Sequence, residues 1–574
     1  MNTPDRPAES TELPVSGHGG AHVVAAAKAH EQDVLWTLSG AHVFPVYDAA
    51  VGGREAVDQA GSSQEAQSSG PMRILDVRNE ATAVFAAEAT GKLTRKPGFA
   101  VVTAGPGVTN AVSGITSAFF NGSPLVVLGG RAPAARWGTG ALQELDHPPI
   151  LESVTKSAFT VPETAGAATA VDSAFALAAR PHRGPVFLDM PMDALFSYGD
   201  SAPPAGTTAT VEPVDTEAVD RITAAVAQAK RPVFVFGGDV WSNGAEDAAK
   251  ALADTLSVPV ILNGMGRGIL PPGNPNLVTR ARSAAFNGAD LVVVVGAPLD
   301  FRLGYGSFGG KEGASPAEVI EIADAPGQIA EHVSHKVAVA GDLTTILTQI
   351  TNGYGNVSGH DHTPWSTELL DKAKVAMAQD ESVLHSDSDP INPGRIYGEL
   401  RPRLESDAVV IGDGGDFVSY AGKYIEPQQP GNWLDPGPYG CLGTGLGYAM
   451  SARVHRPESQ VVLLLGDGAA GFSLMDVDSL VRQDLPIVMI VGNNAAWGLE
   501  KHPMQFLYGY DVAADLAPTR YDEVVQALGG AGETVSQPGE IGPAMDRAFA
   551  AGVPYLVNVL TDPAVAYPRA TTGV

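Results

Sequence analysis

A charged residue follows a continuously hydrophobic run near residue 467. The apolar stretch VVLLL leads directly into Gly-Asp-Gly, in which the acid is Asp467. A later apolar run, LPIVMIVG, ends in Asn493 and Asn494. If the two runs form adjacent parallel strands, their polar side chains meet at the sheet edge where α/β proteins bind ligands. One carboxylate, one amide oxygen and a nearby carbonyl suit Mg²⁺, with phosphate oxygens and water completing the coordination.

Each of these features has a simpler interpretation when it is taken alone. Asp467 could cap the helix that follows it, and the two asparagines could form a turn. The combination of both features at the ends of successive strands favours the cation site instead.

Parallel strands are needed to bring these side chains together, and the whole chain has the pattern that produces them. Short β-branched runs alternate with longer, Ala-rich segments of helical period. Runs that are apolar at every position are typical of strands covered by helices on both faces. We therefore predict an α/β protein of doubly wound parallel sheets. Polar stretches at 198–213 and 352–365 predict linkers between three domains, and the stretch 52–70 predicts an exposed loop.

Size, charge and cysteine content exclude several classes of protein. A chain of 574 residues is too long for one hydrophobic core, and its net charge of −28 argues against nucleic-acid binding. The single cysteine, Cys441, excludes an internal disulfide framework and a zinc cluster of cysteines. The polar, acidic N-terminus lacks a signal-peptide pattern, and no apolar run reaches about 18 residues. We expect a cytoplasmic protein without a membrane segment.

The Gly-Asp-Gly and Asn-Asn pair resembles the cofactor motif of thiamine-diphosphate-dependent enzymes, and the resemblance extends over nearly the whole chain. Residues 78–80, Arg-Asn-Glu, match the family's Arg-His-Glu-like triplet except at the middle position. The segment AVVTAGPGVTNAVSGITSAFFNGSPLVVLGG (100–130) resembles the family's Gly-Pro-Gly segment. The resemblance implies three domains of the thiamine-diphosphate decarboxylase type: a pyrimidine-binding domain (1–195), a central CoA- or nucleotide-binding domain (215–350) and a diphosphate-binding domain (380–574). The C-terminal tail is expected to fold as a lid over the site.

The resemblance also implies roles around thiamine diphosphate and Mg²⁺. The expected metal ligands are Asp467, Asn494 and the carbonyl of Ala496. Glu80 would hydrogen-bond the aminopyrimidine ring, and it should be poorly solvated with a raised pKa. In this family the glutamate and the diphosphate site come from different subunits, which implies a homodimer or a homotetramer.

Further positions are expected to contact the cofactor. In PYGCLGTGLG, Leu442 matches the apolar wedge beneath the bent cofactor, and the Gly440 carbonyl would contact its amino group. We interpret Cys441, beside this wedge, as a packing residue and not as a nucleophile. The other expected cofactor contacts are Gly466, Gly468, Ala469 and Trp497.

Three more residues are expected to take part in catalysis. His42 lies in a Gly-Ala-His loop similar to that of family members that cleave 2-hydroxyketones, where a neutral imidazole could deprotonate a hydroxyl group; alternatively, it caps a turn or packs. Glu500 could accept or relay a proton if it is buried, whereas beside Lys501 it could also be a surface residue of a helix. Gln143 completes the expected catalytic set.

The central domain resembles the CoA-binding domains of oxalyl-CoA decarboxylase and 2-hydroxyacyl-CoA lyase, and it lacks the flavin-contacting signature of acetohydroxyacid synthases. Arg267, Arg282 and Arg302 are therefore expected to bind the phosphates of CoA, or of ADP. Asp324 is the candidate acid for nucleotide recognition, although the family's usual position, 323, holds Ala. The alternative is an empty, vestigial domain.

The resemblance implies, as the activity expected first, cleavage of a 2-hydroxyacyl-CoA to a ketone or aldehyde plus formyl-CoA. The candidate substrate is 2-hydroxyisobutyryl-CoA, as in the actinobacterial lyases that the chain resembles. The principal alternative is an acetolactate synthase-like carboligase that acts on 2-keto acids. A hydroxyketone lyase and a non-catalytic homologue are further alternatives, and intact Glu80, Asp467 and Asn494 argue against the last.

Overall fold

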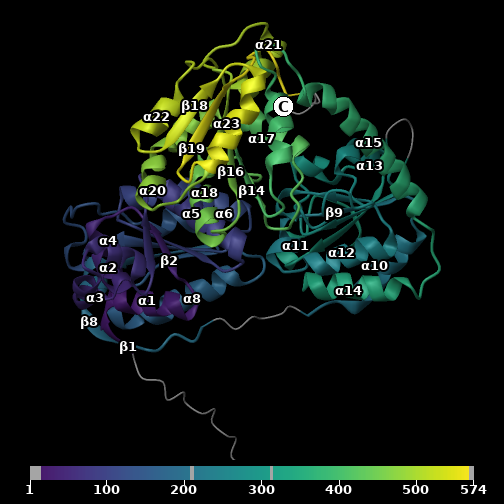
Figure 1. Cartoon of the computed structure of the whole chain (residues 1–574). Helices are drawn as coiled ribbons and strands as arrows, with labels where there is room; N and C mark the ends of the chain where they lie inside the picture. Colours follow the sequence, from purple (N-terminus) through teal and green to yellow (C-terminus); the bar gives the residue numbers. More distant parts are fainter. Residues whose placement is uncertain (1–14, 207–212, 311–314, 568–574) are drawn as a thin grey trace, which may run out of the picture. The chain divides into compact units, whose positions relative to one another are not determined.

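A computed structural model of the chain describes residues 15–206, 213–310 and 315–567 (Figure 1). These residues form two compact units. The first contains residues 15–87, 96–119 and 124–206, and the second contains the other described residues. The expected C-terminal lid spans 557–574: its first four residues belong to a strand, Tyr555–Leu560, and its last seven, 568–574, lie outside the described residues.

The first unit is built on a six-stranded parallel sheet of order β3-β2-β4-β5-β7-β6. Helices α1 (Gly19–Ala29), α2 (Phe44–Val51) and α8 (Ala167–Ala179) pack their small and branched apolar side chains against it in one core cluster. The strands are β2 (Val34–Thr37), β3 (Arg73–Asp76), β4 (Gly98–Val102), β5 (Leu125–Arg131), β6 (Ser157–Thr160) and β7 (Pro185–Pro191).

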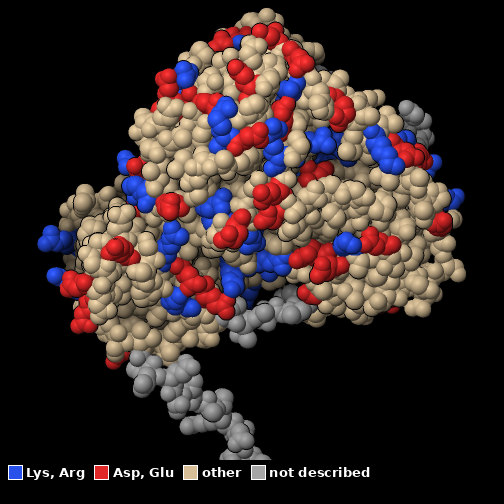
Figure 2. All heavy atoms as spheres, in the orientation of Figure 1, with Lys and Arg blue, Asp and Glu red and all other residues tan. Residues whose placement is uncertain are grey.

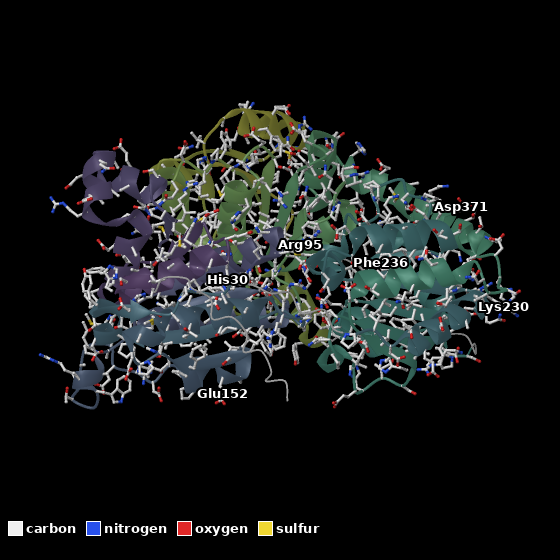
Figure 3. All side chains as sticks on the ribbon, turned by 90° about the horizontal axis from the view of Figure 1, so that it is seen from below. His30, Arg95, Glu152, Lys230, Phe236 and Asp371 are labelled. Carbon is white, nitrogen blue, oxygen red and sulfur yellow. The ribbon has the colours of Figure 1, made fainter. Side chains whose placement is uncertain are left out.

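The second unit contains a five-stranded parallel sheet of order β10-β9-β11-β12-β13. On one face, Phe236, which is labelled in Figure 3, belongs to a core shared with α10 (Thr216–Gln228), α12 (Glu246–Leu256) and α14 (Leu343–Tyr354). On the other face the strands pack against α13 (Arg282–Gly288) and α15 (Thr363–Leu384). The strands are β9 (Pro232–Phe236), β10 (Val260–Leu262), β11 (Leu291–Val295), β12 (Glu318–Ala323) and β13 (His335–Ala340).

The other sheet of the second unit has six parallel strands in the order β15-β14-β16-β17-β19-β18. The chain runs from β14 outward to β15 on one side and then crosses back to β16 on the other side of β14, so β14 and β16 flank the point where ligands bind in open α/β sheets. Asp413, Gly466 and Asn493 are the last residues of β14, β16 and β17. The strands are β14 (Val409–Asp413), β15 (Trp433–Leu434), β16 (Val461–Gly466), β17 (Val488–Asn493), β18 (Ala531–Val535) and β19 (Tyr555–Leu560).

The predicted fold class is confirmed, because three parallel sheets carry helices between successive strands. The prediction of a loop at 52–70 is wrong. This stretch forms α3 (Gly53–Ala60) and α4 (Ser63–Ser69), and Ser62 caps α4 by accepting a hydrogen bond from the backbone N–H of Glu65. The apolar face of α3 is only Ala56, Val57 and Ala60, which are partly buried, and this short face lies within a polar stretch rich in Gly and Ser that is typical of a loop.

The surface of the molecule carries charges of both signs. Figure 2 shows acidic and basic side chains interspersed on the face in view, within a chain whose net charge is −28. Among the described helices, none combines the length and apolar character that a membrane crossing requires.

Candidate active site

The two strand ends that the sequence analysis paired do meet in the structure. The backbone N–H of Ala496 lies 3.2 Å from Oδ2 of Asp467 and 3.1 Å from Oδ1 of Asn494. One donor therefore joins both side-chain oxygens, which places the carboxylate of one strand end beside the amide of the next. Ala495 has a φ of +53°, and this left-handed turn carries the chain back toward Asp467.

Asp467 is a buried carboxylate at the first position of helix α19 (Asp467–Ser473). Its other oxygen, Oδ1, accepts a hydrogen bond from the N–H of Gly468 at 2.9 Å, and Tyr521 donates to its backbone carbonyl at 3.0 Å. Burial raises the pKa of Asp467 to about 6, although the backbone N–H groups of Gly468 and Ala496 oppose that rise. A carboxylate that is destabilised by burial is one that a divalent cation would stabilise.

A cavity of about 470 Å³ opens at these strand ends. Its wall includes Gly466, Asp467, Gly468 and Ala469 from the β16–α19 junction, together with Gly440 and Leu442 from the segment before α18 (Thr444–His455). It also includes Asn494, Ala496, Trp497 and Glu500. The structure thus brings every residue expected to contact the diphosphate end of the cofactor to one cavity.

Asp413, which the sequence analysis did not single out, holds the segment that carries Leu442. Its two carboxylate oxygens accept hydrogen bonds from the backbone N–H groups of Gly443 at 3.1 Å and Gly445 at 2.8 Å. Burial raises the pKa of Asp413 to about 7. Burial, with the charges of Asp413 and Glu88, also raises the pKa of Cys441 to about 11, so this thiol stays protonated at neutral pH.

Trp497 packs tightly against the start of α19. A Cβ atom on Gly468 would lie 2.4 Å from the indole ring, so only glycine allows this approach. The ring also meets Phe472 edge to face, with centroids 6.4 Å apart. The indole therefore forms a firm wall of the cavity.

Glu500 lines the same cavity but is not the buried group that a proton relay would require. It lies in the first turn of α21 (Gly498–Tyr508) and is exposed to solvent. His502, two residues further along the helix, has its Nε2 atom 3.0 Å from the carbonyl oxygen of Pro563. Glu500 can reach a ligand in the cavity, but it is solvated.

Glu80 lies in the first unit, where it is the first residue of α5 (Glu80–Thr94). Its side chain is buried, and its Oε2 accepts a hydrogen bond from Nδ2 of Asn110 at 3.0 Å. Asn110 belongs to α6 (Pro106–Phe120), which begins within the Gly-Pro-Gly segment. A Cβ on Gly107 would lie 3.6 Å from Oε1 of Glu80 and 2.8 Å from Thr103, so this segment passes close to the carboxylate.

His42 and Gln143 flank the same segment of the first unit. The Nδ1 atom of His42 is 3.0 Å from the Thr103 hydroxyl, and burial lowers the pKa of this imidazole. Gln143 has a φ of +60°, which is uncommon for a residue other than glycine. A Cβ on Gly105 would approach Cβ of Gln143 to 2.9 Å. Glu80, His42 and Gln143 thus all border the turn at 103–107.

The three arginines expected to bind CoA phosphates are engaged within the protein. Arg267 is buried, stacks 4.4 Å from the ring centroid of Trp433 and pairs with Glu426 at 3.3 Å. Arg282 donates to the backbone carbonyl of Arg302, and burial lowers its pKa to about 10.

Arg302 and Asp324, the other two expected CoA contacts, also have protein partners. Asp300 accepts hydrogen bonds from Nε and Nη2 of Arg302 at 3.0 and 2.7 Å. Asp324 accepts one from Asn243 at 3.2 Å. These contacts weigh against one phosphate site formed by all of these residues together. Of the four residues expected to bind CoA, only Arg302 lines the cavity.

The donor set fits thiamine diphosphate held through a divalent cation. The buried carboxylate of Asp467, the amide oxygen of Asn494 and the adjoining backbone form an oxygen-only corner. The helix that starts at Asp467 adds an N-terminus, which favours a phosphate. A Cβ on Gly440 would meet nothing within 4 Å, so the backbone there is open to a ligand.

Comparison with known proteins gives an independent result. Three family models match the chain: "Thiamine pyrophosphate enzyme, N-terminal TPP binding domain" at 17–150, the "central domain" at 219–350, and the "C-terminal TPP binding domain" at 413–559. "Acetolactate synthase large subunit IlvG" of Mycobacterium tuberculosis is 45% identical over 99% of both chains.

More distant relatives have another name. "2-hydroxyacyl-CoA lyase 2" of Caenorhabditis elegans is 32% identical over 91% of this chain and 85% of its own, and the protein of that name from Homo sapiens is 30% identical. The whole-length match to these relatives and the three family models agree with the cofactor geometry. The chain therefore belongs to the thiamine-diphosphate-dependent enzymes, the family to which acetolactate synthases and 2-hydroxyacyl-CoA lyases belong.

Proposed function

We propose that this enzyme is a carboligase of the acetolactate synthase type, which decarboxylates one 2-keto acid and joins the remaining fragment to a second. The observation that carries this proposal is Arg302. Among the described residues that line the cavity, it is the one lysine or arginine. Its Nε and Nη2 already donate to Asp300, but its guanidinium lines an otherwise acidic wall, where it could also hold the carboxylate of one small keto acid. The relatives at 45% identity, which are named acetolactate synthases, support the same choice over the acyl-CoA lyase that we expected first.

The cofactor site that we propose uses Mg²⁺ held by Asp467, Asn494 and the carbonyl of Ala496. When bound, thiamine diphosphate supplies a nucleophilic carbon and an electron sink for the bond that breaks or forms. Gly440 and Leu442 would orient its rings, and Gly468 would let the backbone approach the diphosphate.

Residues of the first unit would hold, accept and donate the protons that move during the reaction. Glu80, oriented by Asn110, would hold a proton on the aminopyrimidine ring. His42 is neutral at pH 7 because burial lowers its pKa, so it can accept a proton from a substrate hydroxyl or return one. Gln143 would donate a hydrogen bond from its amide to the oxygen on which charge develops.

Cleavage of a 2-hydroxyacyl-CoA is the second candidate, because the Gly-Ala-His loop carries a neutral His42 that could serve as the base for a lyase. The relatives named "2-hydroxyacyl-CoA lyase 2" add support. This candidate is the weaker one because two of the arginines expected to bind CoA phosphates already have partners within the protein. Arg267 pairs with Glu426, and Arg282 donates to the carbonyl of Arg302.

One pair of assays separates the two candidates. Purified enzyme with thiamine diphosphate and Mg²⁺ is incubated with pyruvate, or with 2-hydroxyisobutyryl-CoA. The proposal expects CO₂ and acetolactate from pyruvate, with no dependence on CoA. Formation of formyl-CoA and acetone without acetolactate would replace it by the lyase. Glu80→Gln serves as the control for both reactions and should abolish either one.

We also propose that the active enzyme is at least a homodimer. Large apolar side chains near the cavity are exposed in the single chain, including Phe472 at 62% and Met475 at 55%. Phe120 and Tyr439, which are stacked with centroids 5.3 Å apart, are exposed as well. Such a patch is typical of a surface that another subunit covers.

A further inference from the structure

A buried histidine–aspartate pair lies in the first unit, apart from the residues that the sequence analysis assigned to catalysis. His147 and Asp189 are both 0% exposed, and Nδ1 of the ring is 2.8 Å from Oδ2 of the carboxylate. Arg131 donates to the same oxygen at 2.8 Å. A charged carboxylate is thus neutralised by an arginine on one side and faces an imidazole on the other.

The second ring nitrogen of His147 determines where the ring proton lies. The backbone N–H of Gly105 donates to Nε2 at 3.0 Å. Because a backbone N–H can only donate, Nε2 is the acceptor, and the proton is on Nδ1, where it is donated to Asp189. His147 therefore connects the carboxylate of Asp189 to the backbone N–H of Gly105, and its two hydrogen bonds fix the position of Gly105 relative to Asp189.

Gly105 is the residue against which Gln143 packs. It has a φ of +59°, and a Cβ atom there would lie 2.9 Å from Cβ of Gln143 and 3.2 Å from its Cα. Gln143 is itself left-handed, with a φ of +60°. A non-glycine residue stays in this conformation only where surrounding contacts enforce it, and such residues cluster at functional sites.

The other side of Gln143 is held by its neighbour in the chain. Glu144 accepts hydrogen bonds from the backbone N–H groups of Gly138 at 3.0 Å and Ala141 at 3.2 Å. Glu144 closes the loop that leads into Gln143, and His147 fixes the turn on which Gln143 rests. The hydrogen bonds of Glu144 and those of His147 therefore both constrain the backbone around Gln143. Gln143 itself remains partly exposed.

We propose that His147, oriented by Asp189, is a positioning residue that holds Gly105 and thereby sets the place of Gln143 in the active site. The consequence for turnover rests on the proposed carboligation and on the role given there to Gln143. The contact with Gly105 does not depend on either.

The experiment compares His147→Met with His147→Gln. Methionine fills the space but cannot join Gly105 to Asp189, whereas an amide has an acceptor and a donor side by side, as the imidazole does. We expect His147→Met to lower kcat for acetolactate formation on the order of 10- to 100-fold with a smaller change in KM, since misplacing a catalytic group acts mainly on turnover. His147→Gln should retain most of the activity.

Two further readouts distinguish positioning from general destabilisation. In the Gln143→Ala background, His147→Met should cause no further loss, because both changes then act through the same group. Hydrogen exchange in the enzyme without cofactor should become about tenfold faster or more at the Gly105 amide in His147→Met, and stay slow in His147→Gln.

His30→Met is the matched control. His30 is also buried, pairs with Asp172 at 2.8 Å and belongs to the first unit, where Figure 3 labels it. This variant should lower the melting temperature while leaving kcat and exchange at Gly105 unchanged.

Three results would overturn the proposal: unchanged exchange at Gly105 in His147→Met, full additivity with Gln143→Ala, or failure of both His147 variants to fold, which would show that the pair supports the whole domain. A wild-type enzyme that makes no acetolactate would refute the proposed function alone, because the exchange result would still decide whether His147 holds Gly105.

Discussion

At the scale of a single residue, the raised pKa of Asp467 predicts how the stability of the protein depends on pH. Its pKa in the metal-free protein is about 6, above the ordinary 3.8, so between these values the native state binds a proton that the unfolded state has released. This residue therefore makes the metal-free protein less stable as pH rises through that range. Mg²⁺ requires the carboxylate form and competes with the proton.

The melting temperature should show this competition. The increase caused by Mg²⁺ with thiamine diphosphate should be full above about pH 7 and should shrink as pH falls through about 6. In Asp467→Asn the increase should be small at every pH. Equal increases for the wild type at about pH 5 and about pH 7.5 would show that Asp467 does not hold the metal.

At the scale of an element, the start of α19 should tolerate no added side chain, whereas its next turn should. In Gly468→Ala the new methyl group would overlap the Trp497 ring, so the indole must move out of the cavity wall. We expect the affinity for thiamine diphosphate, measured by calorimetry, to fall about tenfold or more, equivalent to about 1.4 kcal/mol.

Gly471→Ala is the control in the same helix, because a Cβ there meets nothing within 4 Å. It should leave affinity unchanged and should stabilise the helix by about 0.5–1 kcal/mol. If both alanines weakened binding equally, the close approach at Gly468 would not be the cause.

The sequence could predict elements whose residues are buried on both faces, such as β16 and β17, because their apolar runs are continuous. It could also predict the meeting of Asp467 with Asn494, because parallel strands end at one edge. The Gly-Asp-Gly at the end of β14 (412–414) had the same signal and would have pointed to Asp413. His147 had no such signal, because its partner Gly105 is distant in the chain and the contact exists only after folding. Helix α3 was missed because its apolar face is short, only Ala56, Val57 and Ala60, and lies in a polar stretch rich in Gly and Ser.

At the scale of the whole molecule, the proposed dimer predicts complementation between inactive chains. If each site combines Glu80 of one subunit with Asp467 of another, a mixed dimer of Glu80→Gln and Asp467→Asn has one intact site and one doubly altered site. An equal mixture that assembles randomly should recover about a quarter of wild-type activity. Activity no higher than that of either variant alone would place both residues of a site in one chain.

The measurement that tests the central claim most directly is exchange of the C2 proton of bound thiamine diphosphate in deuterium oxide, followed by NMR after acid quenching. It needs no assumption about the substrate. Our account predicts that the wild-type enzyme accelerates this exchange by about 100-fold or more over the free cofactor, and that Glu80→Gln binds the cofactor but loses the acceleration. Equal exchange rates in wild type and Glu80→Gln would contradict the role of Glu80 on which the proposed site depends.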